Sequence, residues 1–175
     1  EIRNSASGGA CFQMIVPVES AGEDSATLVA ETAPGTAERR TSGRAIRLLV
    51  VDDHHIVREG FAAMLDHQSD FEVVGEAADG RQAIEQAELL QPDAIVMDVE
   101  MPHLNGIEAT RQIKARWPDT VIVGLSLHDD EATHRIMTEA GAAEHINKRA
   151  PGKDLIESLR RACRRELSSE GPQES

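Results

Sequence analysis

The sequence predicts an α/β fold, a five-stranded parallel sheet covered by helices on both faces. Five short apolar runs alternate with five amphipathic stretches between residues 46 and 167, and this alternation is typical of strand–helix units that build a parallel sheet. The apolar runs are nearly continuous, which indicates strands that are buried on both faces. We therefore expect a doubly wound (βα)5 domain.

The predicted elements follow one another in strand–helix order. Strands are expected at residues 46–51, 71–77, 93–97, 120–126 and 143–147. Helices are expected at residues 56–67, 80–90, 105–117, 131–140 and 151–167. The residues expected to share one face of the first helix are Ile56, Val57, Gly60, Phe61, Met64 and Leu65.

Residues at the helix ends support these boundaries. Asp79 suits the N-cap of the second helix, and Pro118 ends the third. Gly141 follows the fourth helix, where a left-handed residue is common, and Pro151 suits the first position of the fifth. The basic run RRACRREL in the fifth helix is interpreted as a solvated helix end whose cations suit the dipole.

Composition argues against several classes of function. The formal net charge of −13 is unsuited to a phosphate backbone, which needs a basic protein face. No run reaches the roughly 18 apolar residues of a membrane helix, and no signal-like segment opens the chain. Cys11 and Cys163 lie outside any C-x-x-C spacing and indicate a reducing compartment. We expect a cytoplasmic protein without membrane contact.

Polar side chains end or follow four of the predicted strands. Asp52 and Asp53 follow the first, Asp98 the third, Ser126 ends the fourth and Lys148 follows the fifth. Sites in open α/β sheets form beyond the carboxyl ends of the strands, so these groups are expected to converge. Mg²⁺ prefers oxygen ligands and relieves the repulsion between nearby carboxylates. A carboxylate can also accept a phosphoryl group, and Asp98 is the central candidate.

Four segments resemble the receiver domain of bacterial two-component response regulators. They read LLVVDDHHIVREGF, PDAIVMDVEMPHLNGIEAT, VIVGLSLHDD and GAAEHINKRAP, in the family's order, within a domain expected at residues 45–168. The nearest subgroup is the one usually fused to a helix-turn-helix output domain. The resemblance implies the flavodoxin-like strand order 2-1-3-4-5. It also implies a phosphorelay in which a histidine kinase or phosphotransfer protein donates the phosphoryl group.

The resemblance implies a role for each carboxylate. Asp98 is the implied phosphoacceptor. Asp53 and Asp98 bind Mg²⁺ through their carboxylates, Glu100 binds it through the backbone carbonyl, and Asp52 holds its waters. The loop after the third strand is expected to be shaped by Met101, Pro102 and Gly106.

The resemblance also implies a switch. Ser126 is the hydroxyl that turns toward the phosphoryl group, and Lys148 pairs with Asp98 or its phosphate. Phosphorylation is expected to shift the surface of the fourth helix, fifth strand and fifth helix, where a partner or a second copy binds. Hydrolysis of the acyl phosphate then makes the domain a slow self-acting phosphatase rather than an enzyme acting on other substrates.

Some residues depart from the family pattern. His145 stands where receivers often have Tyr or Phe and is the expected second switch residue, Asn147 replaces an apolar residue, and Glu144 replaces a common Gly. The Glu100 side chain is expected to affect the lifetime of the acyl phosphate. The histidines expected near this edge are His54, His55, His103, His128 and His145. We interpret them as surface residues rather than zinc ligands.

Two other functions compete with the receiver interpretation. A Mg²⁺-dependent phosphatase with an aspartyl nucleophile usually needs a second acid two residues later, and Glu100 occupies that position. This rival leaves the Asp52–Asp53 pair unexplained. The other rival is an interaction module that has lost phosphorylation, which the complete acid set and Lys148 oppose.

The ends of the chain suggest its context. Residues 5–19, SASGGACFQMIVPVE, resemble the end of a histidine-kinase ATP-binding domain, so residues 1–18 are expected to hold its last strand. Residues 19–44 are expected to be a flexible linker and residues 169–175 a polar tail. Because the chain begins with Glu1 rather than Met, we expect a piece of a hybrid kinase whose C-terminus is the receiver. We expect no nucleic-acid contact through this chain.

Overall fold

The described part of the chain forms a parallel sheet of five strands. A computed structural model describes residues 44–127 and 131–169. The strands are β1 (Ile46–Val51), β2 (Phe71–Ala77), β3 (Ala94–Asp98), β4 (Val121–Ser126) and β5 (Glu144–Asn147). All four pairings are parallel and the strand order is β2-β1-β3-β4-β5. The expected fold class and strand order are confirmed.

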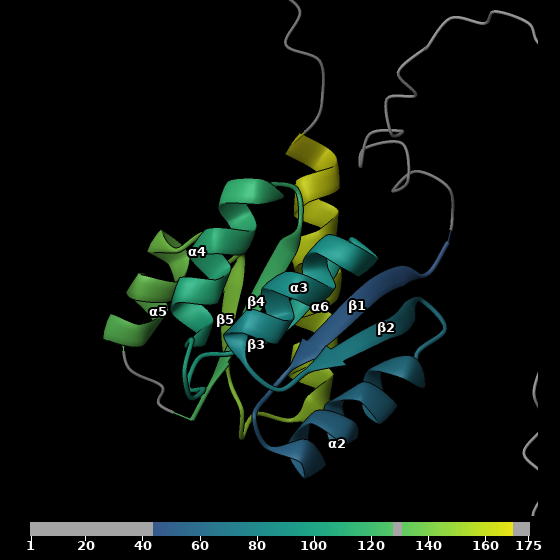
Figure 1. Ribbon diagram of the computed structural model, residues 1–175. Helices are drawn as coiled ribbons and strands as arrows, with labels where there is room; N and C mark the ends of the chain where they lie inside the picture. The colour runs from purple at the N-terminus through teal and green to yellow at the C-terminus, as the bar shows by residue number, and fades with distance from the viewer. Residues whose placement is uncertain (1–43, 128–130, 170–175) are drawn as a thin grey trace, which may run out of the picture. The chain divides into compact units, whose positions relative to one another are not determined.

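Five helices connect and follow the strands. They are α2 (His55–Asp66), α3 (Gly80–Leu90), α4 (Gly106–Arg116), α5 (Glu131–Glu139) and α6 (Gly152–Ser169). Every strand and helix boundary lies within two residues of its expected position. Figure 1 shows α3 in front of the sheet and α6 behind it, as a doubly wound arrangement requires. Within the described residues, no helix combines the length and the apolar character needed to cross a membrane.

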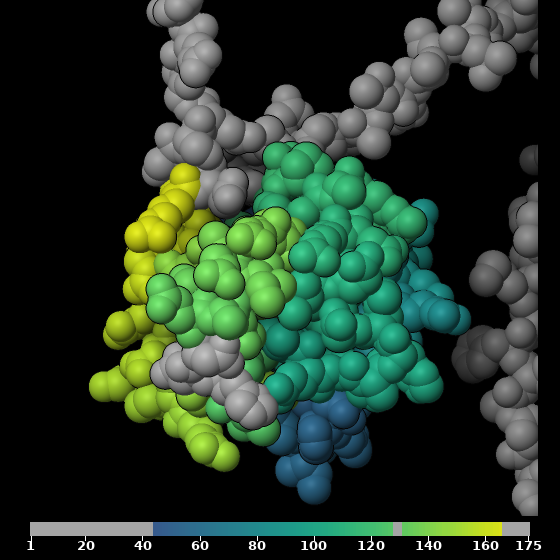
Figure 2. Space-filling view, turned by 90° about the vertical axis from the view of Figure 1, so that its left-hand side faces the viewer, coloured from purple at the N-terminus to yellow at the C-terminus, as the bar shows by residue number. Residues whose placement is uncertain are grey.

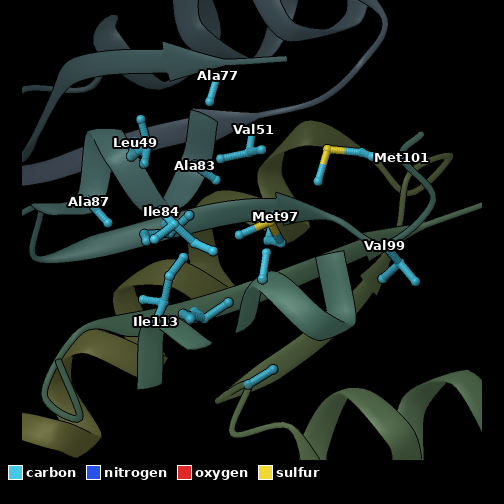
Figure 3. Packing of buried hydrophobic residues seen from close by; sticks show 14 of the residues in the cluster. Leu49, Val51, Ala77, Ala83, Ile84, Ala87, Met97, Val99, Met101 and Ile113 are labelled. Atoms are coloured by element: carbon cyan, nitrogen blue, oxygen red, sulfur yellow. The ribbon is translucent and has the colours of Figure 1, made fainter. Parts of the chain in front are cut away.

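Two apolar cores form, one on each face of the sheet, because successive side chains of a strand point to opposite faces. Leu49 and Val51 of β1 lie in the first core, which α3, α4 and α5 cover (Figure 3). Leu48 and Val50 lie in the second core, which α2 and α6 cover. Figure 2 views the molecule from the side of α4 and α5, whose side chains meet there in one surface. Both cores are largely aliphatic, as the composition predicts.

The helix ends follow their expected chemistry with one small shift. The Asp79 side chain caps α3 by accepting hydrogen bonds from the backbone N–H groups of Arg81 and Gln82. Gly141 has a φ of 102° just after α5, a backbone conformation that glycine adopts without strain. Pro151 lies one residue before α6 rather than at its first position, a difference within the usual uncertainty of helix boundaries.

The prediction that the first turn of α2 shares one apolar face with the rest of the helix is wrong. Ile56 is 82% exposed and Val57 is 39% exposed, whereas Leu65 is fully buried. Ile56 and Leu65 are nine residues apart, so at about 100° per residue they lie on opposite sides of the helix. Phe61 and Met64 do pack against the second core. The inward face is therefore defined by the later part of α2.

The basic run of α6 is more than a solvated helix end. Ala162 and Cys163 are buried in the second core. Arg160 donates hydrogen bonds from Nε and Nη2 to the two carboxylate oxygens of Asp70, both at 2.7 Å. Arg161 makes a similar two-point ion pair with Glu144 of β5. These arginines hold α6 against the sheet, and Asp70 and Glu144 have pKa values below their usual range because the arginine hydrogen bonds outweigh burial.

The expected terminal segments lie mostly outside the described residues. The structure does not describe residues 1–18, nearly all of the expected linker and polar tail, or His128. Arg44, the last residue of the expected linker, is described and belongs to the fold, because its Nη2 donates to both carboxylate oxygens of Asp93. Ser169, the first residue of the expected tail, is the last residue of α6.

Candidate functional site

The carboxyl ends of β1 and β3 bring the expected acids together. Val51 pairs with Met97 in the sheet, so the next residues, Asp52 and Asp98, emerge side by side. One ligand atom from each of Asp52, Asp53, His54 and Asp98 lies within 4.8 Å of every other. The convergence expected from the strand ends is therefore present in the structure.

Lys148 joins this cluster from the end of β5. Its Nζ lies 2.6 Å from Oδ2 of Asp98 and 2.9 Å from Oδ2 of Asp52. Its backbone N–H donates to the carbonyl oxygen of Ser126 at 2.8 Å, which fixes the end of β5 against the end of β4. Burial lowers the pKa of the ammonium, but hydrogen bonds from Lys148 to Asp98 and Asp52 outweigh it and leave the pKa raised. Lys148 therefore remains charged between two carboxylates.

Burial and hydrogen bonding act in opposite directions on the Asp98 carboxylate. It is 1% exposed, and its Oδ1 accepts a hydrogen bond from the backbone N–H of Glu100 at 3.0 Å. Burial raises its pKa to about 6, although the hydrogen bonds from Lys148 and the Glu100 N–H act in the opposite direction. The carboxylate is thus largely ionised at neutral pH but is close to its titration range.

Gly106 lets the loop after β3 fold back against the site. A Cβ at this position would lie 1.9 Å from the carbonyl oxygen of Asp98, so no larger residue fits without moving the backbone. The Gly106 N–H also donates to the carbonyl oxygen of Val99 at 3.1 Å. The expectation that Gly106 shapes this loop is consistent with both contacts.

The remaining expected residues lie at different distances from the acid cluster. Ser126 is fully buried at the end of β4, on the strand next to β3. Glu100 is exposed and touches the cluster through its backbone N–H. His145 lies in β5 with its ring 5.7 Å from the ring of His134 on α5. His145 is therefore part of the α5–β5 surface and not of the acid cluster.

The donor set fits a divalent cation. Three carboxylates and the Lys148 ammonium leave two net negative charges when all are ionised. Asp52 Oδ2, Asp53 Oδ1 and Asp98 Oδ2 are buried, and apart from their ion pairs with Lys148 and His54 they have no hydrogen-bond partner within the described residues. Buried anionic oxygens of this kind are the ligands that Mg²⁺ and related ions prefer.

His54 lies at this edge as an exposed residue, as expected, but its contact with the two acids was not predicted. Its Nδ1 lies 2.7 Å from Oδ1 of Asp53 and 3.5 Å from Oδ1 of Asp52. The signal in the sequence for this contact is the position of His54 directly after the two acids.

Comparison with known families identifies the domain. The family model for the response regulator receiver domain matches residues 48–160. The chain belongs to this family. Receiver domains are the phosphoacceptor modules of two-component systems, so the chain is a signalling domain, and the family match favours this function over the rival phosphatase.

Several proteins resemble this receiver domain. Transcriptional regulatory protein DegU from Brevibacillus brevis is 39% identical over 115 residues, which cover 66% of this chain and 49% of DegU. Response regulator protein VraR from Staphylococcus aureus is 42% identical over 122 residues, which cover 69% of this chain and 58% of VraR. The chain thus spans about half the length of these relatives.

Solved structures agree with the fold. The response regulator domain of Thermotoga maritima CheB has a TM-score of 0.65 and 37% identity, and the match covers 69% of this chain and 98% of that domain. The receiver domain of the response regulator NarL from Mycobacterium tuberculosis has a TM-score of 0.66 and 27% identity over the same shares of each chain.

Proposed function

We propose that Asp98 is the phosphoacceptor of this receiver domain. A carboxylate oxygen of Asp98 attacks the phosphorus of a phosphohistidine, the P–N bond breaks toward the imidazole nitrogen, and an aspartyl phosphate forms. The observation that carries the proposal is the position of Asp98, at the end of β3 within 2.6 Å of Lys148 and inside the acid cluster.

The acid cluster is the proposed Mg²⁺ site. Asp53 and Asp98 supply carboxylate oxygens, Glu100 supplies its backbone carbonyl, and Asp52 holds metal-bound waters. When bound, Mg²⁺ supplies positive charge that offsets the carboxylates and the incoming phosphoryl oxygens. The net charge of the cluster and its buried, sparsely bonded oxygens support this assignment.

Ser126 and Lys148 are proposed to contact the phosphoryl group and to move when it is added. Lys148 lies where it can pair with a phosphoryl oxygen on Asp98, and Ser126 offers a hydroxyl from the neighbouring strand. Their movement toward the phosphoryl group would shift the surface of α5, β5 and α6, including His145. A kinase, a phosphotransfer protein, a downstream partner or a second copy of the chain would recognise this surface.

The aspartyl phosphate is proposed to hydrolyse slowly without a separate phosphatase. Glu100 is exposed next to the site, and its charge is expected to change the approach of water to the phosphorus. Glu100→Ala should change the dephosphorylation rate of the isolated phosphoprotein, followed by intact mass. An unchanged rate would remove Glu100 from this role.

Phosphorylation with a small donor tests the proposed acceptor. The chain is incubated with acetyl phosphate and Mg²⁺, and its intact mass is measured. We expect a gain of about 80 Da, one phosphoryl group, that EDTA prevents and Asp98→Asn abolishes. Asp66→Asn is the matched control, because Asp66 is an exposed aspartate on α2. An adduct of equal yield in Asp98→Asn would refute the assignment.

The wider context of the domain is a second proposal. A hybrid histidine kinase is supported by the motif at residues 5–19, which lie outside the described residues. The names of VraR and DegU instead point to a response regulator, and a regulator with a DNA-binding output is the rival proposal for the parent protein. A cytoplasmic location suits both. The coding sequence on either side of this chain distinguishes them.

A further inference from the structure

We propose that His54 is an additional, nitrogen ligand of the metal site, and that it strengthens the binding of Mn²⁺ and similar transition metals more than the binding of Mg²⁺. This inference rests on the proposed metal site and adds to it a residue and a metal preference. It concerns a side chain that the phosphoacceptor chemistry described above does not use.

The backbone holds His54 against the acid cluster. His54 occupies the N-cap of α2 with an extended backbone, φ −87° and ψ 105°. N-cap side chains usually accept hydrogen bonds from the first turn of the helix, but the His54 side chain makes no such bond. Its backbone N–H instead donates to Oδ1 of Asp52 at 2.9 Å. The backbone of His54 is therefore tied to Asp52, and its ring contacts the two acids rather than the first turn of the helix.

The distances suit shared coordination. In an octahedral site with bonds of about 2.1 Å, adjacent ligand atoms lie about 3 Å apart and opposite ones about 4.2 Å apart. Nδ1 of His54 lies 2.7 Å from Asp53 Oδ1 and 3.5 Å from Asp52 Oδ1. No pair of the four candidate ligand atoms is more than 4.8 Å apart. A small closure of these side chains would bring the Asp53, Asp98 and His54 atoms to one ion, with Asp52 close enough to hold its waters.

A nitrogen ligand changes the preference for the metal. Mg²⁺ is a hard cation that favours oxygen ligands and releases water reluctantly. Carboxylates suit both magnesium and manganese, but imidazole nitrogen suits the first-row transition metals, whose affinity for such sites rises from Mn²⁺ to Cu²⁺. A site whose ligands are two carboxylates, a backbone carbonyl and one imidazole therefore favours a transition metal over Mg²⁺, and its affinity for such a metal should depend on His54.

The adjacent histidine provides a matched control. His55 is the first residue of α2, and its Nε2 lies 3.5 Å from Oε1 of Glu59, one helical turn further along. Its Nδ1 lies 3.3 Å from Nη2 of Arg58. His55 is exposed like His54 but is not a member of the acid cluster. Both His54→Gln and His55→Gln remove an exposed imidazole, but only His54→Gln removes one that belongs to the acid cluster.

Electron spin echo spectroscopy of bound Mn²⁺ tests for the nitrogen ligand. The full chain is loaded with Mn²⁺ at about pH 8, where a histidine of ordinary pKa is neutral. We expect ¹⁴N modulation from an imidazole in the wild-type chain and in His55→Gln. The modulation should change to the ¹⁵N pattern when only histidine is labelled with ¹⁵N, and it should disappear in His54→Gln.

Affinity measurements on the same proteins complete the test. Free Mn²⁺ is quantified by its own spin resonance signal, and Mg²⁺ is added as a competitor. His54→Gln should weaken Mn²⁺ binding by at least about tenfold, the lower end of the usual effect of losing a metal-site partner, and should affect Mg²⁺ less. If the wild-type chain binds Mn²⁺ without histidine modulation, the role of His54 is overturned but the metal site is not. Absence of Mn²⁺ binding would overturn the metal site as well.

Discussion

Replacing Asp98 by Asn should stabilise the metal-free domain at neutral and alkaline pH. Burial raises the pKa of Asp98 from 3.8 to about 6, so the folded protein disfavours the ionised carboxyl. The stability that the neutral carboxyl contributes is present below pH 3.8 and is lost as the pH rises through about 6. Asparagine has a similar shape, carries no charge at any pH and removes this loss.

The expected gain follows from the pKa. A shift of this size corresponds to about 3 kcal/mol of penalty on the charged form above pH 7. The substitution does not leave Lys148 without a counter-ion, because its Nζ also lies 2.9 Å from Asp52. We therefore expect Asp98→Asn to gain up to about 3 kcal/mol at pH 8 and almost nothing near pH 4.

Urea unfolding in EDTA, followed by circular dichroism, measures this gain. A gain of about 3 kcal/mol moves the midpoint by about 1 M or more at the slopes typical of small domains. Asp66→Asn, at an exposed position, should change the free energy of unfolding by less than about 0.5 kcal/mol. Mg²⁺ should then stabilise the wild-type domain and not Asp98→Asn. A destabilised Asp98→Asn at pH 8, or equal stabilisation of both proteins by Mg²⁺, would refute the reasoning.

Two further predictions concern the supports of the site. Lys148→Met leaves Asp52 and Asp98 without their buried counter-ion. It should therefore lower the free energy of unfolding, measured in urea without metal, by about 3 kcal/mol or more. An unchanged unfolding midpoint would contradict this prediction. Gly106→Ala should cost about 3 kcal/mol, because its Cβ meets the Asp98 carbonyl oxygen. Gly60→Ala, in α2 with nothing within 4 Å of the new Cβ, should instead stabilise by about 0.5–1 kcal/mol. Similar losses in both alanine variants would argue against the contact at Gly106.

The fold and the acid cluster were predictable because they depend on patterns that tertiary structure does not override. Continuous apolar strands bounded by polar residues specify a sheet buried on both faces, and parallel strands bring their carboxyl ends to one edge. Asp98 ends its strand, and Asp52, Asp53 and Lys148 follow theirs, so placing the strands also placed these residues. The strand order needed the family resemblance as well.

The errors arose where side-chain direction decides the outcome. Ile56 is apolar, yet its side chain points to the opposite side of the helix from Leu65. Arg160 and Arg161 face Asp70 and Glu144, partners that lie 90 and 17 residues away in the chain. Composition around the arginines does not reveal these pairs. His54 is exposed at this edge as expected, but its contact with Asp53 depends on the backbone angles at the start of α2.

Locating the phosphoryl group within the chain tests the account most directly. After treatment with acetyl phosphate and Mg²⁺, the acyl phosphate is reduced with borohydride, the chain is digested, and tandem mass spectrometry identifies the modified residue. The account predicts modification of Asp98 and of no other residue of the acid cluster. Modification of Asp52, Asp53 or His54 with Asp98 intact would contradict it.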